Sequence, residues 1–265
     1  MLQIIETIGK MVCEWMQIAY DFTKLFLQSV YWIIVGPFKK KPLRRPAVFE
    51  QMVFMGVRSI IIVFFVTFFT GVVLAMQSAY QLKQMGGTIY VASLVSISIC
   101  RELGPVLTAL VIAGRIGAAI TAEIGSMKVN EQIEALETMA ISPIRFLVTP
   151  KLVALFFMLP CLTIIGDLSG MLGGYLVGVY NLGINSHLYI QTAFKFLTLK
   201  DIYTGWSKSF VFAIIIALVG CYQGMNTKGG AVGVGRATTI SVVTSFIMII
   251  IADCIITGIY YFSNM

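Results

Sequence analysis

Five long apolar stretches, separated by shorter polar segments, constrain this chain more than any other feature. We place them at about residues 59–79, 89–120, 146–179, 204–225 and 238–262. Each is as long as the roughly 20 residues that a helix needs to cross a bilayer core. Of all residues 58% are hydrophobic and 12% are charged, and the mean hydropathy is +0.90. A soluble domain cannot bury so much apolar surface, so the sequence predicts an all-α integral membrane protein with five transmembrane helices.

The N-terminal segment has a different pattern, with polar residues every three or four positions opposite an apolar stripe. The polar positions are Gln3, Glu6, Lys10, Glu14, Gln17, Asp21, Lys24 and Gln28. This period predicts an amphipathic helix over residues 2–28 that lies in the membrane interface, and packing against a partner protein is the alternative. A basic elbow follows, in which five cations lie near two helix-stopping prolines. We therefore divide the chain into residues 1–46, the interfacial helix and elbow, and residues 47–265, the membrane domain.

A polar segment at about residues 122–140 separates the second and third apolar stretches. We expect one helix here, with Asn130 as a cap and Glu131 and Glu134 in its first turns, where the helix dipole favours anions. Such a helix between two spans suits docking into a groove on a separate protein. A solvated loop helix explains the same pattern, and the residues alone do not decide between the two.

The distribution of Lys and Arg predicts the orientation of the chain. With the basic elbow on the cytoplasmic side, fourteen of the 19 cations fall in cytoplasmic segments, four fall outside and Arg101 lies within a span. The four outside are Lys83, Lys195, Lys200 and Lys208. This bias places the N-terminus in the cytoplasm and, after five spans, the C-terminus outside. It also explains the net charge of +7 without nucleic-acid binding.

Four ionisable residues inside the apolar stretches are candidate site residues: Arg101, Glu102, Asp167 and Asp253. Each costs roughly 2.5–3.5 kcal/mol on insertion scales, so each needs a compensating role. One interpretation is a polar point in an apolar cavity that takes a ligand with a charged head and apolar tails. The other is an ion pair, Arg101 with Asp167 or Asp253, that only holds the helices together. The residues alone leave both open.

The sequence carries no signature of catalysis or of a bound metal. It has no GxxxxGK[ST] loop, no GxSxG and no HExxH, so it predicts neither nucleotide hydrolysis nor an enzyme. Five cysteines occur without a CxxC, and there is one histidine, so we expect no metal site and no cofactor in this chain. Glycines at every fourth position from Gly166 to Gly178 instead predict close helix packing.

The second apolar stretch and the polar segment after it carry a family resemblance. The run Arg101-Glu102-Leu103-Gly104-Pro105 continues through Ala113-Gly114-Arg115-Ile116-Gly117, Thr121-Ala122-Glu123-Ile124-Gly125 and Glu131-Gln132-Ile133-Glu134-Ala135-Leu136. Together with the glycine-rich run from Gly229 to Gly235 and with Asp253, these motifs resemble the MlaE/YrbE permeases, the membrane subunits of MCE-type ABC transporters. The resemblance covers about residues 47–258, and so many motifs make it very specific.

The resemblance implies a homodimer in the inner membrane, with an interfacial helix, five spans and a cytoplasmic coupling helix over about residues 122–140 in each subunit. Its implied partners are a second copy of the chain, a cytoplasmic ATPase that holds ATP and Mg, a periplasmic MCE-domain protein and, in some systems, a STAS-domain protein. The implied cargo is a glycerophospholipid, moved between inner and outer membranes to maintain outer-membrane lipid asymmetry. Residues 47–265 would then form the MlaE-type permease domain.

The resemblance also assigns residues to two sites. The lipid pocket comprises Leu74, Gln77, Arg101, Glu102, Leu103 and Lys208. The ATPase-coupling residues are Glu123, Glu131 and Glu134. Two alternative functions stay open: a permease for another hydrophobic cargo, such as a sterol or a solvent, and a non-transporting membrane anchor for an MCE-domain ring.

Overall fold

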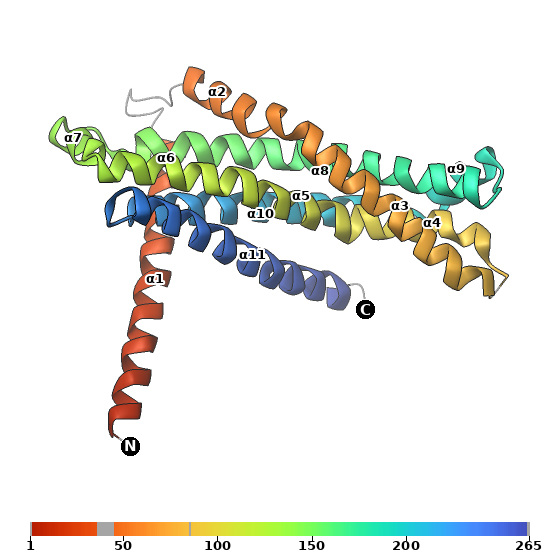
Figure 1. The fold of residues 1–265 in the computed structure, drawn as a ribbon, viewed down its shortest axis with the longest axis horizontal. Helices are drawn as coiled ribbons and strands as arrows, with labels where there is room; N and C mark the ends of the chain where they lie inside the picture. Colours follow the sequence, from red (N-terminus) through yellow and green to blue (C-terminus); the bar gives the residue numbers. More distant parts are fainter. Residues whose placement is uncertain (1, 36–44, 85, 264–265) are drawn as a thin grey trace.

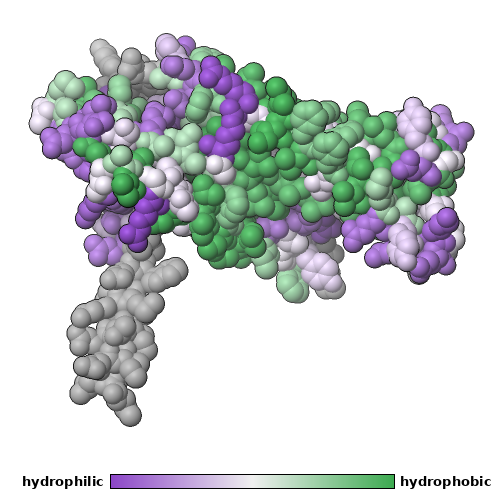
Figure 2. Space-filling view, viewed as in Figure 1, coloured by the Kyte–Doolittle hydropathy of each residue, from purple (hydrophilic) through white to green (hydrophobic). Residues whose placement is uncertain are grey.

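The structure is a computed structural model that describes residues 2–35, 45–84 and 86–263. Every regular element in these ranges is a helix, and most helices run side by side in one elongated bundle (Figure 1). Five helical segments are long and apolar enough to cross a membrane: Arg45–Gln84, Thr88–Val129, Ile144–Asn181, Leu199–Met225 and Gly230–Phe262. The predicted all-α membrane fold with five spans is therefore confirmed. A broad hydrophobic surface lies between two more polar ends (Figure 2).

The first span begins earlier than the apolar pattern indicates. It consists of α2 (Arg45–Met55), a 3₁₀ turn η1 (Val57–Ser59) and α3 (Ile60–Gln84). Helix α2 thus starts at Arg45, which the sequence places in the basic elbow, although Pro46 follows directly. Proline is tolerated in the first turn of a helix because its missing N–H has no partner there. The remainder of the elbow, residues 36–44, lies outside the described residues.

The second span is longer than a bilayer needs, and it deforms just before Pro105. A 3₁₀ turn η2 (Thr88–Tyr90) and α4 (Val91–Ser98) lead into a π turn, η3 (Ile99–Leu103), in which the Gly104 N–H bonds to the carbonyl of Ile99. Because Pro105 lacks an N–H and its ring crowds the carbonyl of Arg101, a wider turn relieves the conflict. The span continues as α5 (Gly104–Ile112), the π turn η4 (Ala113–Gly117) and α6 (Ala118–Val129).

The polar segment that follows is two helices rather than the one predicted. Helix α6 ends at Val129, and Asn130 is its C-cap, with the Asn130 N–H bonded to the carbonyl of Ser126. Glu131 then adopts a left-handed conformation with φ of 58°, which interrupts the helix, and α7 (Gln132–Thr138) follows. The expected capping role of Asn130 at a helix start is therefore wrong. The short α7 stands at one tip of the molecule (Figure 1).

The remaining spans form the centre of the bundle. The third span comprises the π turn η5 (Ile144–Val148), α8 (Thr149–Leu176) and the π turn η6 (Val177–Asn181). A short helix α9 (Ser186–Phe196) leads to α10 (Leu199–Met225) and α11 (Gly230–Ser263). The apolar window of α10 is 61% buried and that of α11 only 11%, so α10 is a core helix while α11 presents most of its apolar surface outward.

The glycine stripe of α8 packs as closely as the sequence predicts. A Cβ on Gly71 of α3 would lie 1.9 Å from the carbonyl oxygen of Gly170 in the stripe, and one on Gly173, beside the stripe residue Gly174, would lie 2.2 Å from the carbonyl oxygen of Phe68. No side chain fits between the two backbones at these points. Hydroxyl groups add polar contacts nearby, since Thr67 of α3 and Ser169 of α8 share a hydrogen bond. Close packing and such interhelical hydrogen bonds hold helices together where lipid removes the hydrophobic drive.

Helix α1 (Leu2–Val35) leaves the bundle at a steep angle (Figure 1). It extends seven residues beyond the predicted residues 2–28 and is not among the five candidate spans. Its last turns contact η5, α8 and α10, where Ser29 and Leu25 are buried. The α6–α7 turn, the start of α2 and the α10–α11 turn share one end of the bundle, while α9 and the turn after α3 share the other (Figure 1).

Candidate functional site

A charge cluster inside the bundle is the strongest candidate for a functional site. At its centre is Lys208 of α10, whose side chain has no solvent exposure. Its ammonium group forms an ion pair and hydrogen bond with Glu102 and donates a second hydrogen bond, 2.7 Å long, to the hydroxyl of Thr257. The Asp253 carboxylate lies 2.8 Å from the same nitrogen. Thr257 donates in turn to Glu102 at 3.2 Å, which closes the network.

Three separate helical segments supply the cluster, and each contributes for a local reason. Glu102 belongs to the π turn η3, where the extra residue per turn changes the direction of the side chains around Pro105. Asp253 and Thr257 are four residues apart on α11 and so share a helix face. Because Lys208 carries one positive charge against two carboxylates, the cluster has an excess negative charge.

The cluster is closed on one side and open on the other. The Glu102 side chain is 33% exposed and that of Asp253 is 23% exposed, while Lys208 lies beneath them. The buried ammonium therefore orients the two carboxylates without being accessible itself. Parts of both acidic side chains thus stay accessible within apolar helices, although the Asp253 oxygen that faces Lys208 is itself buried.

The ion pairs differ from those expected. The ion-pair interpretation joins Arg101 to Asp167 or Asp253, but the Arg101 guanidinium lies 3.8 Å from Asp201 near the start of α10. Asp201 also accepts hydrogen bonds from the backbone and hydroxyl of Thr198, and so caps α10. Lys208 was counted among the cations outside the membrane, whereas the structure places it within the fourth span. Sequence separation hides these pairings, because the partners belong to different helices.

Asp167, the fourth ionisable residue within a span, stands apart from the cluster. One of its carboxylate oxygens is buried without a hydrogen-bond partner among the described residues. A Cβ on Gly104 would lie 1.7 Å from this oxygen, so the carboxyl group rests directly against the backbone that follows η3. Asp167 is thus a neighbour of the π turn and takes no part in the ion pairs around Lys208.

The other expected pocket residues divide into two groups. Leu103 is half-buried in η3, directly after Glu102. Leu74 and Gln77 lie on α3, where Leu74 is half-buried against a small apolar cluster and Gln77 is exposed. Within the described ranges, no hydrogen bond or ion pair joins Gln77 to the charge cluster. Of the six expected pocket residues the structure joins Glu102 and Lys208 directly, and the pocket roles of all six stay predictions.

The three expected coupling residues lie at the α6–α7 end in different settings. Glu123 of α6 forms an ion pair of 2.7 Å with Lys151 of α8, a lysine that is 2% exposed. Glu134 of α7 forms an ion pair with Lys128, and that hydrogen bond holds the pKa of the Glu134 carboxyl below its usual range. Glu131 is the exposed left-handed residue between the helices. Their coupling role stays a prediction.

Three functional candidates escape sequence analysis. Thr257 is an ordinary residue in an apolar run, Asp201 looks like a surface residue, and Lys151 appears as one more cytoplasmic cation. Only the fold shows that each binds a charged partner. A search of the described residues for three or more metal-ligating side chains in one place finds no such group. The fold and the cluster together define a polytopic helical membrane protein with an ionised site inside its bundle.

Comparison with known proteins identifies the family. The sequence model of the family described as "Permease MlaE" matches residues 48–259 of this chain. A probable ABC transporter permease protein of Rickettsia typhi is 41% identical over 261 residues, which cover 98% of this chain and 99% of that protein. A probable ABC transporter permease protein of Synechocystis sp. is 41% identical over 211 residues, which cover 80% of this chain and 80% of that protein. One of Pyropia yezoensis is 37% identical over 208 residues, which cover 78% of this chain and 79% of that protein.

The chain belongs to the MlaE permease family. It is an ABC transporter permease subunit, a membrane component that is not an enzyme, and this class implies a partner ATPase.

Proposed function

We propose that this permease moves glycerophospholipids between the inner and outer membranes and so helps to maintain outer-membrane lipid asymmetry. The charge cluster around Lys208 is the observation that carries the proposal. A phospholipid combines a small charged head with two apolar tails. The cluster combines partly exposed charges with apolar helices that lipid surrounds, which is the matching arrangement.

The headgroup finds two kinds of complementary charge at η3. The excess negative charge of Glu102 and Asp253 attracts a cationic amine. Arg101, 34% exposed and only loosely paired with Asp201, offers a guanidinium group that binds phosphate in a bidentate way. Arg101 and Glu102 are adjacent in the π turn but have different partners, Asp201 and Lys208, so they would engage the headgroup from different directions. Leu103, Leu74 and Gln77 would line the path of the tails.

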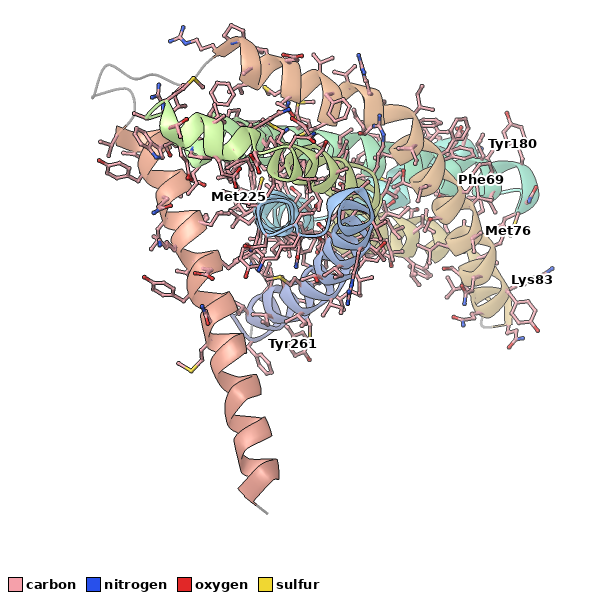
Figure 3. All side chains as sticks on the ribbon, turned by 60° about the vertical axis from the view of Figure 1, so that its left-hand side comes forward. Phe69, Met76, Lys83, Tyr180, Met225 and Tyr261 are labelled. Carbon is pink, nitrogen blue, oxygen red and sulfur yellow. The ribbon has the colours of Figure 1, made fainter. Side chains whose placement is uncertain are left out.

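Uncovered apolar surfaces on two spanning helices support the proposal that the chain functions as a homodimer. Helices α3 and α11 leave most of their apolar windows outside the bundle, with 28% and 11% buried. Figure 3 shows Phe69 and Met76 of α3 pointing outward, and Tyr261 marks the far part of α11, which diverges from the bundle. A second copy of the chain that packs on this side would enclose the charge cluster between two subunits.

Energy would reach the pocket from the α6–α7 end. We assign residues 122–140 to the contact with a cytoplasmic ATPase, which holds ATP and Mg, and place the N-terminus inside and the C-terminus in the periplasm. Helix α6 is continuous with the span that carries Glu102, so a push on this segment is transmitted along one helix to η3. A periplasmic MCE-domain protein would receive the lipid at the α9 end, and a STAS-domain protein would bind on the ATPase side.

The test uses the complete transporter reconstituted with its ATPase and MCE-domain protein in phospholipid vesicles. Glu102→Ala is expected to lower ATP-dependent lipid transfer at least tenfold while the dimer and the bound ATPase are retained. Gln191→Ala, at an exposed polar position on α9, is the control and should transfer lipid normally. Loss of the folded complex in Glu102→Ala would show that the cluster only holds the bundle together.

Two other outcomes would select the alternatives. Mass spectrometry of lipids that copurify with the complex from native membranes should recover glycerophospholipid in Glu102-dependent amounts. Recovery of a sterol or solvent in its place would identify a different hydrophobic cargo. Absence of any ATP-dependent transfer by the unmodified complex would identify the chain as an anchor for the MCE-domain ring.

A further inference from the structure

An apolar cavity lies between the last turns of α8 and α9, and one of its lining residues, Met171, has its sulfur 4.0 Å from that of Cys100 in η3. It has a volume of about 280 Å³ and is enclosed mainly by Leu168 and Leu172 of α8 and by Tyr189, Ile190 and Phe194 of α9. Pockets that enclose a drug-sized molecule measure roughly 300–1,000 Å³. This cavity therefore accommodates a segment of an extended chain, and a whole two-tailed lipid does not fit.

The walls of this cavity are suited to an apolar occupant that enters from the bilayer. Leu168, Leu172, Ile190 and Phe194 are all exposed, between 46% and 64%, so the cavity continues into the apolar surface of the bundle. Leu168 and Leu172 belong to the third candidate span. An apolar cavity that opens directly from a spanning helix faces hydrocarbon chains rather than water.

One polar group breaks the apolar lining. Tyr189 is 3% exposed, and its hydroxyl has no hydrogen-bond partner in the described part of the chain. The ring packs tightly against Gly178 and the hydroxyl lies next to Gly174, which offers it no side-chain acceptor. Burial raises the pKa of Tyr189 to about 12, so the group is a neutral O–H donor at physiological pH. A buried donor without an acceptor is costly and calls for a ligand that supplies one.

Aromatic residues place this hydroxyl at the depth of the lipid ester groups. Tyr90, Tyr180 and Tyr203 are exposed at the same end of the bundle, and the Tyr90 ring packs edge-on against Phe196 of α9. Figure 3 shows Tyr180 and Lys83 on the same side of the molecule, well apart from each other. Exposed tyrosines of this kind concentrate at the membrane–water interface, just where the ester carbonyls of phospholipids lie.

We propose that the α8–α9 cavity is a binding site for one acyl chain of a resident bilayer phospholipid, whose ester carbonyl accepts a hydrogen bond from the Tyr189 hydroxyl. The cavity shares no lining residue with the charge cluster around Lys208. It does not depend on the cargo, because it requires only that the bundle spans a phospholipid bilayer. The bound lipid would fix α9 against α8 at the end where cargo would leave.

The probe is a phosphatidylethanolamine with a photoreactive diazirine beside the ester carbonyl of one acyl chain, present in trace amounts in vesicles of unlabelled phosphatidylethanolamine. The full-length protein is reconstituted, irradiated and digested, and labelled peptides are identified by mass spectrometry. We expect labelling of peptides from α8 and α9 well above that of the exposed outer face of α3, which reports random contact with lipid.

Two matched substitutions test the hydrogen bond. Tyr189→Phe removes only the unpaired hydroxyl, and it should lower specific labelling about two- to tenfold. Tyr175→Phe is the control on the same cavity, because the Tyr175 hydroxyl is already paired with Ser186 at 2.7 Å, and labelling should be unchanged. A Leu172→Trp substitution at the rim, where the side chain is 47% exposed, should block the site without disturbing the core.

Several results would overturn the proposal. Labelling of α9 no stronger than that of α3, or equal labelling of Tyr189→Phe and the unmodified protein, would show that no specific lipid binds. Loss of α9 labelling in Glu102→Ala would show that the occupant is cargo in transit. Thermal stability gives an independent check, since Tyr189→Phe should stabilise the protein in lipid-free detergent and lose this advantage when phosphatidylethanolamine is added. An advantage that persists in lipid would also refute the proposal.

Discussion

Removal of the Lys208 ammonium group is the sharpest test of the charge cluster. In Lys208→Met, a side chain of similar length fills the space, but Glu102 and Asp253 then face each other without a counter-ion. At an effective dielectric constant of 20, opposite charges 2.8 Å apart attract by about 6 kcal/mol, and the desolvation of a fully buried lysine offsets several kcal/mol of this. Breaking a buried pair costs roughly 3–5 kcal/mol. Because both carboxylates are partly exposed and can hydrate, we expect the low end, about 3 kcal/mol.

The assay is reversible unfolding of the purified protein in mixed micelles, followed by tryptophan fluorescence. A loss of about 3 kcal/mol corresponds to a change of roughly 100-fold in the unfolding equilibrium. Lys200→Met is the control, since this lysine is on the same helix but exposed, and a surface change of this kind is expected to stay within about 0.5 kcal/mol.

A compensated variant separates stability from function. In the triple variant Lys208→Met, Glu102→Gln, Asp253→Asn, no net charge remains in the cluster, so most of the lost stability should return while ATP-dependent lipid transfer does not. The reasoning would be refuted if Lys208→Met alone unfolded like the unmodified protein. It would also be refuted if the triple variant were no more stable than the single one, since the destabilisation would then come from packing rather than from unpaired carboxylates.

Three further predictions concern the rest of the bundle. Gly71→Ala should destabilise the protein by about 1–3 kcal/mol in the same unfolding assay, because its Cβ would meet the α8 backbone, whereas Gly258→Ala has open space and should have little effect. Thr121→Val should cost about 0.6–1.7 kcal/mol, since its hydroxyl links α6 to α10 and α11, and an unchanged midpoint would contradict this. Carbon-13 titration should show a depressed Glu134 pKa that returns to its usual range in Lys128→Met. The stability this pair supplies is then present above the unfolded-state pKa and is lost as pH falls through the lower folded-state value, so a Glu134 pKa unchanged by Lys128→Met would refute the pairing.

Much of the architecture can be predicted from sequence because a lipid bilayer permits very few backbone structures to cross it. Long apolar runs can satisfy their backbone only as helices, so five spans follow from five runs. The glycine stripe of α8 is equally local, because every fourth residue returns to the same helix face. The position where a helix ends is predicted less well from sequence. The polar pattern of residues 122–140 is continuous, but the left-handed conformation of Glu131 divides this segment into two helices.

The site is predicted only in part, for a related reason. The free-energy cost of placing an ionisable side chain in a membrane identifies Arg101, Glu102 and Asp253 as candidates. This cost can be judged without knowing which residues lie next to them in the fold. Pairing does need neighbours, and the partners of Lys208 come from helices that are 106 and 45 positions away in the chain. No single segment of the sequence indicates that Arg101 pairs with Asp201. No single segment indicates that Thr257 binds Lys208 and Glu102.

The order of charges along the chain has a consequence for how the protein is assembled. Synthesis brings Glu102 into the membrane first, Lys208 two spans later and Asp253 last, so the charges that meet in the cluster arrive with alternating sign. Lys208 arrives as the counter-ion of Glu102, and Asp253 arrives when Lys208 is already in place. Within this cluster the nascent chain therefore never holds two unpaired charges of the same sign in the lipid. A chain that stopped before α11 would already be neutral at this point. Helix α11, whose apolar window is the least buried of the five candidate spans, therefore adds the second carboxylate, that of Asp253, only after Lys208 is in place to pair with it.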